Sequence, residues 1–123
     1  MKGQKLFVRP MEAADAEAVT EFLARESPIS SFPRAALLGK LVGNLVAVLA
    51  MEMTDDSVAI RDLVVARDLR HKRIGRFMID ELYALAAKMD REQLVLECGG
   101  PKEFLERAGF SKNGERMVRR VMP

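Results

Sequence analysis

Residues 60–86 read "IRDLVVARDLRHKRIGRFMIDELYALA", and this stretch decides the fold of the chain. The part from Val58 to Ala66 is dense in β-branched residues and predicts a strand. From Ile74 to Met89, apolar residues recur at steps of three and four, which predicts a helix with a broad apolar face. A strand that reaches a helix through a basic, glycine-containing loop is an anion site by geometry, because unpaired amides and the positive helix end converge there. The basic side chains around Gly75 are those of Arg70, His71, Lys72, Arg73 and Arg76.

The N-terminal half predicts one helix and three strands. Residues 5–9 predict a short strand ended by Pro10, and residues 11–25 predict an amphipathic helix. Residues 35–38 and 42–51 predict two strands joined by a turn at Gly39 and Lys40. A polar turn, "TDDS", leads from them into the strand described above. In the predicted N-terminal helix the apolar side carries Ala14, Ala18, Phe22 and Leu23, and Asp15 lies near the positive start.

The C-terminal third predicts a buried parallel strand over Gln93–Glu97, a two-turn helix closed by Gly109, and a last strand over residues 115–122. The predicted order is therefore β α β β β α β α β. This order predicts an α+β (mixed α/β) fold, with a central mixed, mostly antiparallel sheet and helices on both faces.

Composition narrows the class of protein. A chain of 123 residues is long enough for one core, so we expect a single domain over residues 1–123. A net charge of +2 is too small to favour nucleic-acid or membrane binding by the whole surface. One cysteine and one histidine make a disulfide or a zinc site implausible, and no signal-peptide pattern or 18-residue apolar run is present, so we expect a cytoplasmic protein without a metal.

Three segments resemble the GNAT superfamily of acyl-CoA-dependent N-acetyltransferases. The basic loop is similar to the family's Arg/Gln-x-x-Gly-x-Gly/Ala motif, with Arg70 at its first position and Gly75 at its last. "PKEFLERAGF" resembles the family's A-x-x-F-Y-E-K-x-G-F segment, and "FVRPMEAADAEAVTEFL" resembles its first strand and helix. These segments follow one another in the family's order and cover most of the chain.

The resemblance implies a binding mode for acetyl-CoA or another acyl-CoA. The diphosphate would lie on the amides between His71 and Arg76, which include those of Lys72, Arg73 and Ile74. The pantetheine would run along Leu63, Val64 and Val65. In this family the two central strands separate, so unpaired strand backbone can bond the pantetheine amides as an added strand would.

Two positions depart from the family pattern. Arg73 replaces the middle glycine of the loop motif, where a right-handed helical conformation would let an arginine fit without penalty. Leu105 stands where the family commonly has a tyrosine that protonates the leaving thiolate. The tyrosine of this chain, Tyr83, lies on the apolar face of the predicted helix and is more typical of a core residue.

Candidate catalytic residues lie on two predicted strands, Asp62 within residues 58–66 beside the expected thioester and Glu97 at the end of the following strand. Glu97 is the preferred general base, and Asp62 is a second carboxylate that could take a proton from the acceptor ammonium. Each has an alternative interpretation as an exposed or salt-bridged strand-end carboxylate. Cys98 could protonate the thiolate, although a lone cysteine is more often a small core residue.

The leading hypothesis is an N-acetyltransferase that moves an acetyl group from acetyl-CoA to a primary amine by direct attack. The alternative is a non-catalytic acyl-CoA-binding sensor or interaction module of the same fold. Nucleic-acid binding through the loop and Arg116, Arg119 and Arg120 is disfavoured, since no aromatic residues are interleaved with these cations. The short segment "ESPISSFPR" predicts an open cleft, to be completed by a second subunit in a homodimer or to admit a peptide or small-molecule amine.

Overall fold

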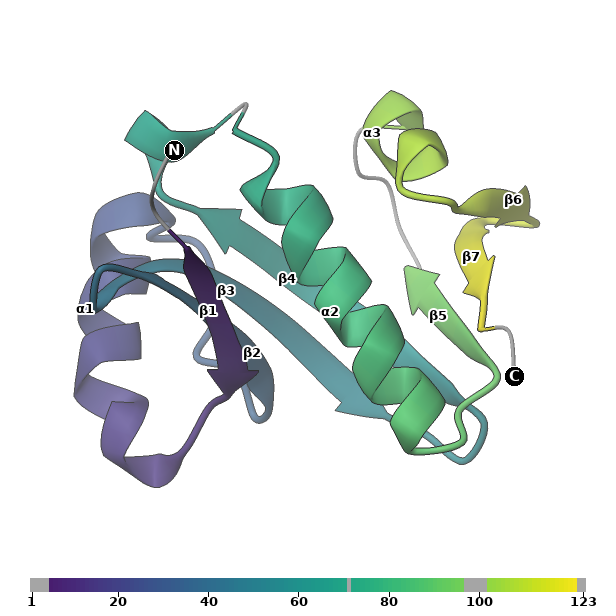
Figure 1. Cartoon of the computed structure of the whole chain (residues 1–123), viewed down its shortest axis with the longest axis horizontal. Coiled ribbons are helices and arrows are strands. Elements are labelled where there is room, and N and C mark those ends of the chain that lie inside the picture. The colour runs from purple at the N-terminus through teal and green to yellow at the C-terminus, as the bar shows by residue number, and fades with distance from the viewer. Residues whose placement is uncertain (1–4, 71, 97–101, 122–123) are drawn as a thin grey trace.

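The computed structural model describes residues 5–70, 72–96 and 102–121. They form a seven-stranded sheet in the order β1-β2-β3-β4-β5-β7-β6, shown in Figure 1. Neighbouring strands are antiparallel except β4 and β5, which are parallel. The predicted fold class is confirmed. The strands are β1 (Leu6–Pro10), β2 (Ala36–Leu41), β3 (Asn44–Met53), β4 (Ser57–Val65), β5 (Gln93–Leu96), β6 (Ser111–Asn113) and β7 (Arg116–Arg120). The helices are α1 (Ala16–Glu26), α2 (Ile74–Lys88) and α3 (Lys102–Arg107).

Helices α1 and α2 cover opposite faces of the sheet. Leu63 of β4 reaches to 3.4 Å from the position that a Cβ on Gly75 of α2 would take. Its neighbour Asp62 bonds Ser30, which follows α1. Because successive strand side chains point to opposite faces, α2 and the end of α1 lie on different sides of β4. Figure 1 shows α2 crossing one face of β3 and β4. No helix among the described residues is long and apolar enough to cross a membrane.

The buried apolar residues form one continuous cluster between the sheet and the helices. Helix α2 contributes the side chains expected from its spacing, although Met89 and Phe77 at the edges of the predicted stripe are 42% and 41% exposed. The long helix therefore packs through the apolar face that its periodicity predicts. The buried part of that face is narrower than predicted. Its fully covered residues are Ile74, Met78, Ile79, Leu82 and Ala86.

The first hairpin turn lies three residues later than predicted. Gly39 and Lys40 are inside β2, so the predicted turn there is wrong, and the turn is made by Val42 and Gly43 with φ of 50° and 80°. Gly39 belongs in the strand because the Sδ atom of Met78 lies 2.9 Å from where a Cβ would stand. A glycine was required there by close packing against α2, and not by a turn.

The N-terminal helix is shorter than predicted and shows a different face. A 3-10 turn over Ala13–Asp15 (η1) precedes α1, and the buried residues of α1 are Val19, Phe22 and Leu23. The predicted Ala14 and Ala18 are exposed. The chain at Asp15 is held by Arg9 of β1, whose guanidinium donates to both carboxylate oxygens at 2.6 and 2.8 Å.

The C-terminal third carries one more strand than predicted. β6 is three exposed residues paired with β7, and it follows a turn in which Gly109 has a φ of 94°. Arg119 of β7 lies 3.1 Å from the place of a Cβ on Gly109, bonds Asp80 of α2 at 2.9 Å, and stacks over Tyr83 at 4.2 Å. Arg119 thereby fastens β7 and the turn after α3 to helix α2.

Candidate functional site

The parallel strands β4 and β5 are joined at only one end. Their pairing covers Ser57 to Ala59 on β4 and ends at Val95 on β5. Leu96, the last described residue of β5, pairs with Met117 of β7 but with no described residue of β4. Figure 1 shows the two strands diverging toward their C-terminal ends. Beyond Ala59, one side of β4 is therefore left without a neighbouring strand among the described residues.

The backbone of Leu63–Val65, which we call the open segment of β4, presents hydrogen-bonding groups on this unpaired side. Ala66 donates its N–H to Val46 of β3 at 2.8 Å. Since backbone groups alternate along an antiparallel strand, Val64 also faces β3, whereas the N–H and C=O groups of Leu63 and Val65 face away from it. An extended ligand could pair with these four groups as a strand would.

Two charged side chains occupy the ends of this row of four groups. The N–H of Leu63 donates to Oδ1 of Asp62 at 2.9 Å, and Nε of Arg70 donates to the carbonyl of Val65 at 3.4 Å. A buried or unpaired backbone group is costly, so these contacts satisfy the strand edge where no strand does so. Both side chains are free to turn toward water or a ligand, since each is at least partly exposed.

The open segment leads through the 3-10 turn η2 (Arg67–Leu69) into the start of α2. The first helical hydrogen bond runs from the N–H of Phe77 to the carbonyl of Arg73 at 3.0 Å. The N–H groups of Ile74, Gly75 and Arg76 precede it and so have no partner within the helix. They point out of the positive end of a fifteen-residue helix. The sequence predicts an anion site at this position, and the exposed residues Lys72, Arg73 and Arg76 surround it.

Arg73 begins α2 in a left-handed conformation, with φ of 63° and ψ of 15°. The right-handed angle expected for this arginine is therefore wrong. The turn keeps the backbone shape that a glycine would favour and imposes it on a residue with a side chain. We attribute the positive φ to the sharp change of direction between the loop and the helix.

Gly75 sets how closely α2 approaches the open segment. A Cβ on Gly75 would stand 3.4 Å from Cδ2 of Leu63 and 3.4 Å from the ring of Phe104 in α3. These are ordinary contact distances, so an alanine would also fit. The start of α2, the open segment and α3 thus meet around this residue. Leu105 points elsewhere, into the core, and is 4% exposed.

A groove of about 690 Å³ lies beside the open segment, on the α1 side of the sheet. Asp62 lies at its floor, and Oδ2 of Asp62 accepts a hydrogen bond from Ser30 at 2.6 Å. Arg61 is an extra residue of β4 at an irregularity in the pairing with β3, and it bonds Glu52 at 2.7 Å. We call this the loop groove. It is lined by Ser27, Ile29, Ser30, Ser31, Phe32, Pro33, Arg34, Ala35, Ala50, Met51, Glu52, Met53, Arg61 and Asp62.

Asp62 connects the loop groove to the open segment. One carboxylate oxygen faces the groove through Ser30, and the other is bonded to the strand backbone at Leu63. The structure brings Asp62, Arg70 and the open segment together. Val64 is buried and its backbone is used by β3, so the groups of Leu63 and Val65 are the ones that face a ligand. His71, Glu97 and Cys98 lie outside the described residues.

The loop groove contains functional candidates that sequence reasoning missed. Ser27, Ser30 and Arg34 line it, whereas the sequence analysis predicted an open cleft from the short segment that carries them and assigned no role to these side chains. The cluster of serines was the available signal, since short hydroxyl side chains in a loop orient nearby carboxylates. Tyr83 faces Arg119, as described above, and takes no part in the groove lining.

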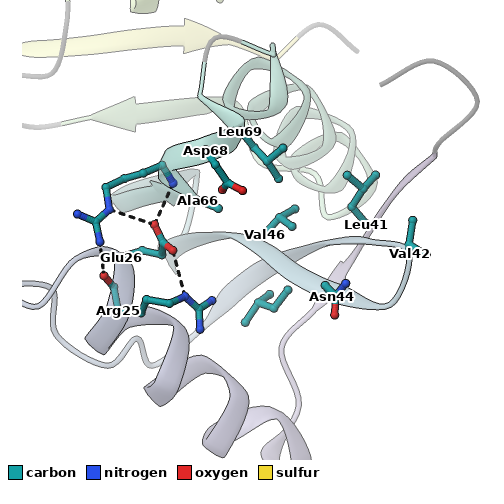
Figure 2. A pocket seen from close by; sticks show the side chains of 11 residues that line it. Arg25, Glu26, Leu41, Val42, Asn44, Val46, Ala66, Asp68 and Leu69 are labelled. Atoms are coloured by element: carbon teal, nitrogen blue, oxygen red, sulfur yellow. Dashed lines mark hydrogen bonds and ion pairs between the residues drawn. The ribbon is translucent and has the colours of Figure 1, made fainter.

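A second pocket, of about 700 Å³, lies where α1 ends and β4 runs into η2. Figure 2 shows its polar wall, where the carboxylate of Glu26 lies between Arg25 and the chain after Ala66. Glu26 accepts the backbone N–H of Arg67 at 2.9 Å and contacts Arg25 at 3.1 Å. The Arg67 backbone bond, followed by the two guanidinium groups, lowers the pKa of Glu26. This carboxylate anchors the chain just after the open segment.

The carboxylate of Asp15 also has a lowered pKa. The bond from Arg9 and the backbone bond from Glu12 lower the pKa of Asp15 well below its usual range. It lies at the junction of β1 and η1 and is 7% exposed. Its role is to hold the N-terminal strand against the first helix. Among the described residues, no cluster of three acidic, histidine or cysteine side chains could hold a metal ion.

Comparisons with known proteins agree on the fold. The acetyltransferase (GNAT) family model matches residues 4–110. The structure is similar to N-acetylglutamate synthase from Neisseria gonorrhoeae, in complex with coenzyme A and N-acetyl-glutamate, with 14% identity, a TM-score of 0.80, and coverage of 97% of this chain and 36% of that one. The chain thus spans about a third of the synthase. Among curated proteins, no sequence is a significant match.

Two further solved structures are similar along nearly their whole length. The ribosomal-protein-S18-alanine N-acetyltransferase from Escherichia coli has 13% identity and a TM-score of 0.78, with coverage of 97% of this chain and 96% of that one. A GNAT family acetyltransferase from Brucella melitensis in complex with acetyl-CoA has 14% identity and a TM-score of 0.77, with coverage of 97% and 90%. At such identities the likeness establishes the shared fold.

Proposed function

The chain belongs to the acetyltransferase (GNAT) family, and we propose that it transfers an acetyl group from acetyl-CoA to a primary amine. One observation carries this proposal. The unpaired side of β4 leads through η2 to the start of α2, so an open row of strand groups is followed by amides that have no partner within the helix. An extended amide chain that ends in a diphosphate matches both features, and the pantetheine diphosphate of CoA has this form.

The proposed cofactor position follows from these groups. The diphosphate lies on the N–H groups of Ile74, Gly75 and Arg76, with the nearby guanidinium and ammonium groups offsetting its charge. The pantetheine amides pair with Leu63 and Val65, and Arg70 leaves the Val65 carbonyl to bind phosphate. The thioester then lies beyond Leu63, near Asp62. The similar structure from Brucella melitensis is a complex with acetyl-CoA, which supports acetyl-CoA as the ligand.

The proposed reaction is direct attack by an amine held in the loop groove. Asp62 accepts a proton from the substrate ammonium, and the neutral nitrogen forms a bond to the thioester carbonyl carbon. The C–S bond breaks, and the departing thiolate takes up a proton as CoA leaves. Ser30 orients the carboxylate through its 2.6 Å hydrogen bond. Glu97, which the sequence analysis preferred as the general base, and Cys98, as the proton donor to the thiolate, stay predictions.

Binding of acyl-CoA without catalysis is the second candidate function. Two observations favour it. Leu105 is buried where the family commonly has a tyrosine, and Arg73 bears a side chain at the loop position where a glycine is usual. A sensor would retain the cofactor site and lose the proton donor. Thiol release with an amine acceptor separates this function from acetyl transfer.

The test combines binding and turnover. A ligand that binds only the folded protein stabilises it by about 2.7 kcal/mol at one hundred times its Kd, so CoA is expected to raise Tm in a concentration-dependent way. Acetyl-CoA with a pool of primary amines is expected to release free thiol. Arg70→Ala is expected to weaken CoA binding while leaving the Tm of the free protein nearly unchanged.

The outcomes distinguish the two functions from a failure of both. A Tm shift with thiol release supports the transferase, and a Tm shift without thiol release supports the sensor. An unchanged Tm at saturating CoA and acetyl-CoA contradicts both. Equal losses of stability and CoA affinity in Arg70→Ala would assign this arginine to the fold alone.

A further inference from the structure

The loop groove has a charge pattern that follows from the register of three strands. Ala36 of β2 pairs with Ala50 of β3, which pairs with Asp62 of β4. These residues form one row across the sheet, and Ala50 and Asp62 of this row line the groove. The next row toward the loop begins at Arg34, because the register continues through the hydrogen bond from the N–H of Met51 to the carbonyl of Ala35.

The second row carries an excess positive charge. It contains Arg34 and Glu52, and Glu52 is neutralised by a 2.7 Å ion pair with Arg61, the extra residue of β4 at the irregularity. Arg34 is exposed, lines the groove, and makes no hydrogen bond or ion pair with any residue in the described ranges. Its guanidinium, with five donors in a fixed fork, is suited to a carboxylate.

The first row carries the opposite charge. Asp62 accepts hydrogen bonds from Ser30 and from the backbone of Leu63, and no described cation is paired with it. The two rows lie about 7 Å apart along the strands, and β2 and β4 lie about 10 Å apart across β3, so the backbones of Arg34 and Asp62 are about 12 Å apart. The long Arg34 side chain can extend over part of this distance. Ile29 and Phe32, which are 97% and 49% exposed, form an apolar rim along the groove.

We propose that the acceptor of the loop groove carries an anionic group, preferably a carboxylate, on the Arg34 side of its reacting amine. The ammonium is directed to Asp62 and the anion to Arg34, while the apolar rim covers the spacer between them. This inference rests on the proposed acetyl transfer. The same chemistry occurs in short amino acids with separated charges and in a peptide whose second residue is acidic.

The test uses acceptor pairs that differ in one charge. The pair 4-aminobutanoate and 4-aminobutanamide represents the small-molecule source, and the dipeptides Ala-Glu and Ala-Gln represent the peptide source. The charged member of at least one pair is expected to have a kcat/KM about 10-fold above that of its neutral partner. The pair that shows the preference identifies the source.

Arg34→Gln is expected to abolish the preference by lowering kcat/KM for the charged acceptor and leaving that for the neutral acceptor nearly unchanged. The matched control is Arg120→Gln on β7, an exposed arginine outside the groove, which should keep the preference. Titration of Ala-Glu and Ala-Gln into CoA-saturated protein supplies a second readout, since binding does not require turnover.

Each outcome has a distinct meaning. Equal kcat/KM within both pairs, or a preference that survives Arg34→Gln, overturns the inference and leaves the acetyl transfer intact. Stronger, Arg34-dependent binding of Ala-Glu without any thiol release upholds the charge pattern and contradicts the transferase proposal. Equal binding of both dipeptides without thiol release contradicts both proposals.

Discussion

The two ends of β4 satisfy the backbone groups on its outer side in different ways. At its start, Ser57 to Ala59 are paired with β5, and the buried Ser57 hydroxyl also accepts a bond from Gln93 at 3.1 Å. At its end, the outward groups of the open segment are met by Asp62 and Arg70. A strand neighbour cannot leave without unfolding, whereas a charged side chain can turn into water. The difference separates a structural edge from one that is available to a ligand.

Proline substitutions at two adjacent positions of β4 test this difference and have the largest expected effects. Val64→Pro removes an N–H that faces β3 and is expected to lower the free energy of unfolding by about 3 kcal/mol or more. Val65→Pro removes an N–H that faces away, so the loss of stability should be much smaller, while CoA affinity falls about 5- to 10-fold. Chemical denaturation and CoA titration measure the two effects. Similar destabilisation by both variants would contradict the assigned strand directions.

Asp62→Ala tests the side chain that bonds the open segment. It removes the side chain that occupies the Leu63 N–H and is the proposed base, so turnover should fall by about 100-fold or more. CoA affinity should stay equal or rise, because the N–H becomes available to pantetheine. Thiol release and CoA titration separate the two effects. A parallel loss of CoA affinity and turnover would show that Asp62 serves the cofactor site instead of the acceptor.

Arg73→Gly tests the loop between the open segment and α2. Relief of the left-handed backbone at residue 73 is expected to raise the free energy of unfolding by about 1 kcal/mol, which is roughly 3 °C in Tm. Arg73→Ala is the matched control, since it removes the same charge and keeps a Cβ in that conformation. Tighter CoA binding by the glycine variant than by the alanine variant would assign the effect to backbone shape.

Glu26→Gln gives the smallest expected effect and tests the anchor just beyond the open segment. The folded-state pKa of Glu26 is lowered, so its ionised form stabilises the fold above the unfolded pKa, and this contribution is lost as pH falls through the folded pKa. We expect a modestly lower Tm for the variant at pH 7 and a shrinking difference below about pH 4. Glu17→Gln on exposed α1 is the control. A pH-independent difference would contradict the ionic role.

The elements with strong local patterns were predictable from the sequence. The β-branched run of β4 and the periodic helix α2 lie within a residue or two of their predicted bounds. The turn between them was recognisable because basic residues and a glycine stand where a strand meets a helix. The packing of α2 follows from the same periodicity, since its central apolar residues are the fully buried ones.

The elements decided by distant contacts were not predictable. Gly39 resembled a turn residue because its reason for being glycine, the sulfur of Met78, lies on another element. β6 has three exposed residues and no alternation to reveal it. Arg73 takes a backbone angle that its type disfavours, which the surrounding turn imposes. The loop groove depends on Ser30 reaching Asp62 across 32 positions of the chain.

The short pairing between β4 and β5 also determines how far an extended ligand can enter between these strands. β7 pairs with β5, and β6 pairs with β7. Among the described residues, three residue pairs therefore join these three strands to the other four. Each additional residue pair would shorten the opening between β4 and β5 by about 3.3 Å, the rise of one strand residue. The depth that an inserted chain can reach therefore changes in steps of one residue. A change in the number of paired residues would shift the position of the ligand's reactive end without altering any side chain that lines the opening.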